Sequence, residues 1–227
     1  AEKKAPSAEI KEITIPIEKK TLHTIQREII SAYVKNNKTI RIIGDSLNKH
    51  SEEIREMVHN LVGLEIIEQT QNRIIASDLV NIESISVVDV IRRIDIIVRA
   101  MMFDAVQIPE KDIYENIFSR DKDVNRLTIL LYRTSKYFMD NPHVSNSLKP
   151  TDYFRFWTIA ENLERIGDEI KRSARFLRKP KLPKEKVNTI TNEYREVEKY
   201  YVQVMNAFYK KDNELLFASG TKRDEIM

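Results

Sequence analysis

The chain has 227 residues, of which 41% are hydrophobic and 32% charged, so it is long enough to bury one large or two modest cores. Its formal net charge of +3 argues neither for nor against nucleic acid, and the lack of cysteine excludes disulfides, thiolate nucleophiles and Cys-ligated metal sites. No apolar run approaches the roughly 20 residues that span a bilayer, and we expect a cytoplasmic protein without direct membrane insertion.

The first segment, residues 1–82, mixes short β-branched runs with short helical patterns. ITIPI alternates and is typical of an edge strand, because Pro16 cannot donate a hydrogen bond to a neighbouring strand. Residues 22–32 have helical apolar spacing, TIRII indicates a second strand, and Ser51 and Gly63 bracket a short helix. LEIIEQ and RIIAS complete a hairpin. The order β-α-β-α-β-β predicts a small α+β domain.

From Val87 onward the apolar residues recur at alternating steps of three and four along successive segments. This narrow seam is typical of long antiparallel helices in left-handed bundles. Proline-containing breaks separate the segments, as expected where helices end. We therefore predict a mainly α chain, in which residues 83–180 form a first three-helix bundle and residues 184–227 begin a second bundle that the sequence truncates.

Acidic side chains beside this seam are the candidates for chemistry. In ENLERIGDEI, on the third predicted helix, Glu164 and Asp168 lie four residues apart, and Asp121 and Asn125 repeat that spacing on the second. If the two helices pack antiparallel, four oxygen-bearing side chains converge into a cradle for a hard cation. The alternative is surface carboxylates that pair with nearby arginines. Gly167, inside the same helix, predicts close approach of a neighbouring helix or ligand.

The segment that follows, residues 171–186, is strongly basic and spans the end of the third helix and a linker. Cations near a helix C-terminus are favoured by its dipole, and a charged linker stays solvated. A phosphate-rich or acidic partner surface is the alternative explanation. The four histidines share no metal-ligand spacing, and we identify no His or Lys that accompanies the acidic cluster as a base.

Three stretches resemble one known family. NLERIGDEI resembles the signature helix of PhoU-type phosphate-uptake regulators, which carries an E-x-x-x-D motif, and RDKDVNRL resembles that family's D-x-x-x-D motif. The region from ISAYVKNNKTIRI to RIIASDL resembles the N-terminal α/β region of archaeal-type members. The resemblance extends from about Leu22 to the C-terminus.

The resemblance implies a fold of two similar three-helix bundles, each binding a metal cluster of iron, zinc or another divalent cation. The ligands in the first bundle would be Asp121, Asn125, Glu164 and Asp168. Asn125 replaces the family's second aspartate, which lowers the charge of the site and weakens metal binding. The corresponding motif of the second bundle would begin near residues 222–225.

The resemblance also implies function. We expect a non-enzymatic, homodimeric regulator of phosphate uptake and phosphate signalling that binds components of a phosphate ABC transporter or a sensor kinase. The α/β domain would serve dimerisation or sensing. One alternative is a metal-dependent phosphohydrolase that uses the acidic cluster. Another is a transcriptional regulator, and nucleic acid is expected as a partner only if an upstream DNA-binding domain precedes the sequence.

Overall fold

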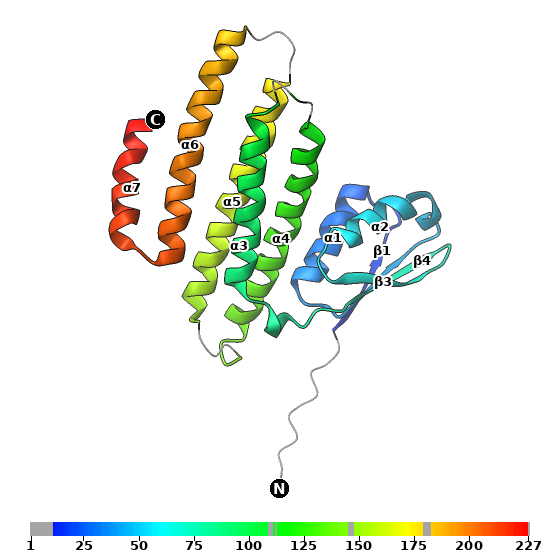
Figure 1. The fold of residues 1–227 in the computed structure, drawn as a ribbon. Coiled ribbons are helices and arrows are strands. Elements are labelled where there is room, and N and C mark those ends of the chain that lie inside the picture. The colour runs from blue at the N-terminus through cyan, green and yellow to red at the C-terminus, as the bar shows by residue number, and fades with distance from the viewer. Residues whose placement is uncertain (1–10, 109–110, 112, 145–147, 179–182, 227) are drawn as a thin grey trace. The chain divides into compact units, whose positions relative to one another are not determined.

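The computed structural model describes residues 11–108, 111, 113–144, 148–178 and 183–226, with side chains described as far as residue 220. A four-stranded sheet with two helices comes first, and long helices follow (Figure 1). The predicted fold class, mainly α with a small N-terminal α+β part, is confirmed. None of the described helices combines the length and apolarity that crossing a membrane requires.

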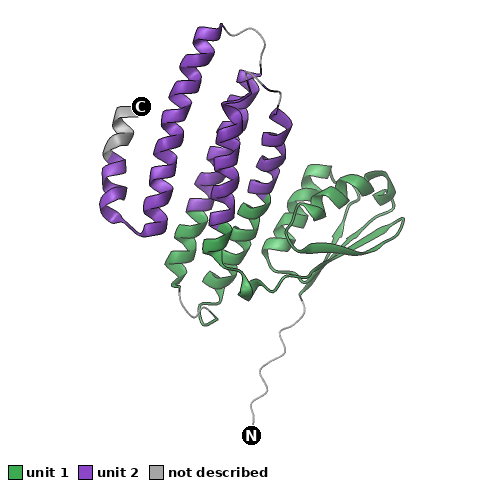
Figure 2. Cartoon of the chain, viewed as in Figure 1, with its two compact units in different colours: residues 1–90, 126–158 green, residues 91–125, 159–227 purple. Residues whose placement is uncertain are grey.

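The chain divides into two compact units (Figure 2). Unit 1 contains residues 1–90 and 126–158, and unit 2 contains residues 91–125 and 159–227. The division passes through continuous helices, because it groups residues by their contacts. The sequence-based division at residues 82 and 180 therefore stays a prediction.

Unit 1 contains the sheet, with strand order β1-β2-β4-β3. β1 pairs parallel to β2, while β4 pairs antiparallel with both β2 and β3. Pro16 ends β1 at the edge of the sheet, as the sequence predicts. A β-bulge lies between Ile66 and Glu68 in β3. The elements are β1 (Glu12–Pro16), α1 (Leu22–Val34), β2 (Thr39–Ile43), η1 (Leu47–His50), α2 (Ser51–His59), β3 (Leu64–Gln69), β4 (Arg73–Asp78) and η2 (Ile82–Ser84).

The core of unit 1 lies between the sheet and the helices α1 and α2. Ile40 and Ile42 are fully buried, whereas Thr39 and Arg41 alternate with them and remain partly exposed, as expected for a sheet with one covered face. Residues from α1, α2 and all four strands share this apolar cluster, and the α4 side chains Ile129 and Tyr132 pack against it.

A buried ion pair joins α4 to the sheet within unit 1. The Arg133 guanidinium donates to both carboxylate oxygens of Asp78, at 2.6 and 3.3 Å, and its Nε donates to Asn36 Oδ1 at 2.7 Å. The guanidinium carbon lies 4.3 Å from the centre of the Tyr33 ring. Both charged side chains are at most 5% exposed. The pair thus fixes a long helix against the end of β4.

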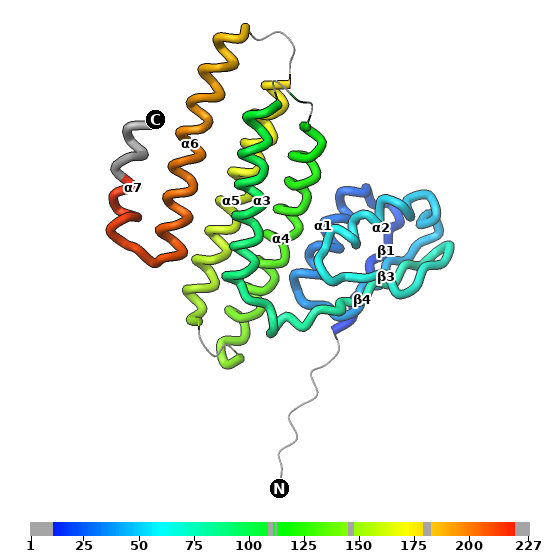
Figure 3. The backbone as a smooth tube through the Cα atoms, in the orientation of Figure 1, coloured from blue at the N-terminus to red at the C-terminus, as the bar shows by residue number. Residues whose placement is uncertain are grey.

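The regular secondary structure described in unit 2 is helical. Its core follows the predicted seam, since Ile91, Ile94, Val98 and Met101 are all fully buried. Pro183 precedes α6, a left-handed Lys211 ends it, and α6 and α7 form a hairpin (Figure 3). The long helices are α3 (Val87–Ala105), α4 (Tyr114–Asp140), α5 (Pro150–Leu177), α6 (Lys184–Lys210) and α7 (Asn213–Ile226).

A buried carboxylate ties α6 to α3 inside unit 2. Asp95, only 3% exposed, accepts hydrogen bonds from Tyr201 Oη at 2.7 Å, Tyr209 Oη at 3.1 Å and Arg99 Nε at 2.9 Å. Three donors compensate the loss of hydration that burial imposes on the charge. Tyr201 is itself buried, and its hydroxyl therefore has a charged partner inside the core.

Candidate functional site

Asp121 on α4 and Asp168 on α5 meet at a common cation in unit 2, which is the ammonium group of Lys171. Lys171 Nζ lies 2.5 Å from Asp121 Oδ2 and 2.7 Å from Asp168 Oδ1. The side chains of Asp121 and Lys171 are 8% and 17% exposed, and that of Asp168 is 33% exposed. The predicted approach of the two helices therefore brings these carboxylates together.

Glu164 belongs to the same electrostatic cluster. Its pKa is raised, first by burial and then by the negative charges of Asp168 and Asp121. Lys171 opposes this shift. Asn125 lies one turn beyond Asp121 on α4 and is half-buried. Three carboxylates and one ammonium thus share this part of unit 2, and the amide lies on the helix that carries Asp121.

Lys171 accompanies the acidic cluster as a hydrogen-bond donor, although its local spacing in the sequence did not indicate a contact with α4. Lys171 follows Asp168 by three residues, which places both on the same side of α5. The sequence analysis placed Lys171 in a basic segment at the end of a helix. There the helix dipole favours cations, so no partner on α4 was needed to explain its position. The contact between Lys171 and Asp121 could not be predicted from local spacing, because the two residues are 50 apart in the sequence.

Lys171 is held in its charged form. Burial by itself lowers the pKa of Lys171, but the hydrogen bonds to Asp121 and Asp168 outweigh it, so the pKa is raised overall. An ammonium group with a raised pKa stays protonated at neutral pH and cannot accept a proton as a general base. The cluster therefore holds its helices together by charge, without an available lysine base.

The donor set does not fit a metal ion in this arrangement. Within the described ranges, no group of three or more His, Asp or Glu side chains is placed to hold one. The ammonium group lies between the two carboxylates that would be ligands, and Asn125 contributes only a neutral oxygen. Metal binding by Asp121, Asn125, Glu164 and Asp168 stays a prediction that requires Lys171 to leave. The motif expected near residues 222–225 lies outside the side chains described.

Neighbouring carboxylates follow the simpler expectation of surface ion pairs. Arg165 pairs with Glu161 at 2.8 Å, and Arg172 pairs with Glu169 at 2.6 Å, both on the exposed side of α5. Gly167 is buried, and a Cβ built there would lie 3.7 Å from Met101 Cε, which is an ordinary packing distance. Gly167 therefore lies where helices pack together, and the space around it would also accommodate the methyl group of alanine.

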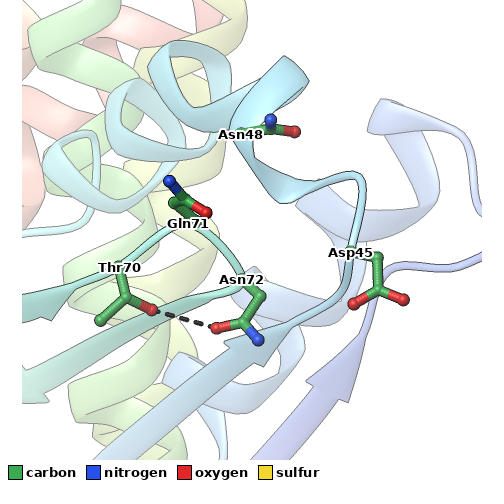
Figure 4. A pocket seen from close by; sticks show the side chains of 5 residues that line it. All are labelled: Asp45, Asn48, Thr70, Gln71 and Asn72. Carbon is green, nitrogen blue, oxygen red and sulfur yellow. Dashed lines mark hydrogen bonds between the residues drawn. The ribbon is translucent and has the colours of Figure 1, made fainter.

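A polar pocket in unit 1 and an apolar pocket in unit 2 lie outside this cluster. In unit 1 a polar pocket of about 440 Å³ lies between the loop after β2 and the β3–β4 turn, where Thr70 Oγ1 donates to Asn72 Oδ1 at 3.2 Å (Figure 4). Asp45 is the only charged side chain among the residues that line it. In unit 2 an apolar pocket of about 510 Å³ is bordered by Met102, Ile166 and Tyr194. Neither pocket includes a residue of the acidic cluster.

Comparison with known proteins identifies the helical region. Residues 91–177 match the family model described as the PhoU domain. The matched segment runs from the first turns of α3 to the end of α5 and contains the whole cluster around Lys171. A search of curated proteins and of solved structures found no significant match. The family resemblance seen in the sequence motifs is therefore confirmed over this segment.

Proposed function

Because residues 91–177 form a PhoU domain, we propose that the chain regulates phosphate uptake by binding protein partners and without catalysing a reaction. The match to this regulatory family is the observation that carries the proposal. The partners would be a component of a phosphate ABC transporter or a sensor kinase that responds to phosphate supply. The expected role of the α/β part in dimerisation or sensing belongs to the same proposal.

The chemistry of the cluster supports a binding role over a hydrolytic one. A two-metal hydrolase needs carboxylates free to hold its ions and an open coordination position. Here Asp121 and Asp168 are both hydrogen-bonded to Lys171, which stays protonated. A carboxylate engaged in this way serves helix packing more readily than metal-assisted attack of water.

One end of unit 2 offers a surface for a partner. Phe103 in the last turn of α3 and Phe176 in the last turn of α5 are more than 60% exposed, and Phe118 near the start of α4 is 40% exposed. Ion pairing between Arg120 and Asp104 joins the adjoining ends of α3 and α4. We call these three phenylalanines the aromatic end. Exposed aromatic side chains from successive helices are typical of binding surfaces.

Cations accompany the aromatic end. Lys122 Nζ lies 5.4 Å from the centre of the Phe118 ring, and the Arg178 guanidinium lies 5.4 Å from that of Tyr114. Arg178, the last described residue of the basic segment before Pro183, thus lies at the same end of the domain. This combination suits a partner surface that carries both apolar and acidic groups.

The test is direct binding to purified transporter and kinase components from the host, measured by biolayer interferometry. We expect the chain to bind one of them, and Phe103→Ser with Phe176→Ser to weaken binding about tenfold or more, as for buried aromatic anchors. Phe217→Ser is the matched control, because Phe217 is 81% exposed but lies outside the matched segment. If neither component binds the wild-type chain, the proposal fails.

A further inference from the structure

We propose that the Lys171 ammonium group is the resident cation of this PhoU domain, in the position where the family resemblance implies a metal. The lysine, and not the loss of one carboxylate at Asn125, would then be what keeps metal from the site. This inference concerns the contents of the site and does not depend on which partner the domain binds.

The geometry makes the lysine and a metal ion mutually exclusive. Lys171 Nζ lies 2.5 Å from Asp121 Oδ2 and 2.7 Å from Asp168 Oδ1. Divalent ions bind carboxylate oxygens at about 2.0–2.6 Å, so an ion shared by the same two oxygens would occupy nearly the same point as Nζ. Repulsion between two cations that close would be large in a partly buried site.

The ammonium group also reproduces the structural role of a bridging ion. Asp168 and Lys171 are on α5, while Asp121 is on α4, so the contact closes the gap between two helices. Lys171 is attached to the chain and its stem packs into the domain, with only 17% of the side chain exposed. An attached cation binds its partners at a high effective concentration and needs no supply from solution.

The negative charge of the cluster suits singly charged protein cations better than a multiply charged metal cluster. Asn125 is neutral, so the cluster holds three carboxylates, those of Asp121, Glu164 and Asp168. Arg165, which pairs with Glu161, adds a second positive charge near Glu164. Two protein cations therefore act on three carboxylates, and the helices can assemble in the absence of divalent ions.

The first experiment measures divalent ions on the purified full chain by elemental analysis and by calorimetric titration with Mn²⁺, Zn²⁺ and Fe²⁺. We expect no stoichiometric ion and no change in melting temperature after treatment with a chelator. Any metal ion that binds is assigned to this site if the Asp121→Asn variant no longer binds it. One bound ion per chain that Asp121→Asn abolishes would overturn the proposal.

The second experiment removes the lysine. In Lys171→Met we expect the melting temperature to fall by about 5–10 °C, as for loss of one partner from a partly buried ion pair, and to recover when Mn²⁺ or Zn²⁺ is added. Lys199→Met is the matched control, since Lys199 pairs with Glu196 on the exposed surface of α6. An unchanged melting temperature in Lys171→Met, with no gain in metal binding, would contradict the proposal.

The third experiment separates Lys171 from Asn125 and does not depend on the folding of Lys171→Met. Asn125→Asp restores a carboxylate while the lysine remains, and we expect this variant to stay free of metal. Adding Lys171→Met to it should then produce tighter metal binding than Lys171→Met alone. If Asn125→Asp by itself binds a stoichiometric divalent ion, Asn125 is the obstacle and the proposal is wrong.

Discussion

Arg133→Met tests whether a buried charge holds α4 against the sheet in unit 1. Methionine has a long unbranched side chain like arginine but carries no charge. The substitution therefore removes the two hydrogen bonds to Asp78, the bond to Asn36 and the stacking on Tyr33. Asp78 would then remain only 5% exposed. Its carboxylate would keep a hydrogen bond from the Val80 amide at 3.1 Å and the more distant Lys38 ammonium at 3.6 Å.

The expected loss follows from that uncompensated charge. Removing one partner of a buried ion pair costs about 3–5 kcal/mol, and the contacts that Asp78 retains place our expectation near the lower end. Replacing both partners removes the buried charge altogether. Arg133→Met with Asp78→Leu should therefore recover more than half of the stability that Arg133→Met loses.

Urea unfolding followed by circular dichroism measures these differences in the free energy of unfolding. Arg172→Met is the control, because Arg172 pairs with Glu169 on the surface and we expect a change below about 0.5 kcal/mol. A loss below about 1 kcal/mol for Arg133→Met, or a double variant as unstable as the single one, would refute the reasoning.

Three further predictions concern single substitutions. Tyr201→Phe removes a 2.7 Å hydrogen bond to the buried Asp95 carboxylate, and thermal unfolding should show a loss of about 2 kcal/mol; an unchanged melting temperature would contradict this. Gly167→Ala should stabilise the chain by about 0.5–1 kcal/mol, because a Cβ there meets only ordinary contacts and alanine favours helix; a lower melting temperature would show that α5 requires the glycine. The hydrogen bond to Glu83 raises the pKa of Tyr137 to about 12 from 10.0, so its stabilising contribution is complete below pH 10 and is lost as pH rises through 12. Tyr137→Phe should accordingly remove the part of the tyrosinate absorbance change centred near pH 12, and an unaltered titration curve would count against the assignment.

Periodic patterns predicted the elements well. The alternating steps of three and four after Val87 identified long helices, and the buried Ile91, Ile94 and Val98 lie on the predicted seam. Pro16 correctly indicated an edge strand. These features depend on residues close together in the sequence, where helix and strand geometry dictate which side chains share a face.

Pairings between distant residues could not be predicted in this way. Arg133 and Asp78 are 55 residues apart, and Tyr201 and Asp95 are 106 apart. Nothing in local spacing tells which buried donor meets which buried carboxylate, because that depends on how the elements pack. The same holds for Lys171: its contact with Asp168, three residues away, could be predicted from helix spacing, but its contact with Asp121, 50 residues away, could not.

The most direct test of the regulatory role is the rate of radiolabelled phosphate uptake in the host with and without this gene. We expect deletion to leave uptake high when phosphate is plentiful, and the wild-type gene to restore its reduction. A reintroduced gene carrying Phe103→Ser and Phe176→Ser should fail to restore it, while one carrying Phe217→Ser should succeed. If deletion changes neither the rate of uptake nor its response to phosphate supply, the account of this chain as a phosphate-uptake regulator is contradicted.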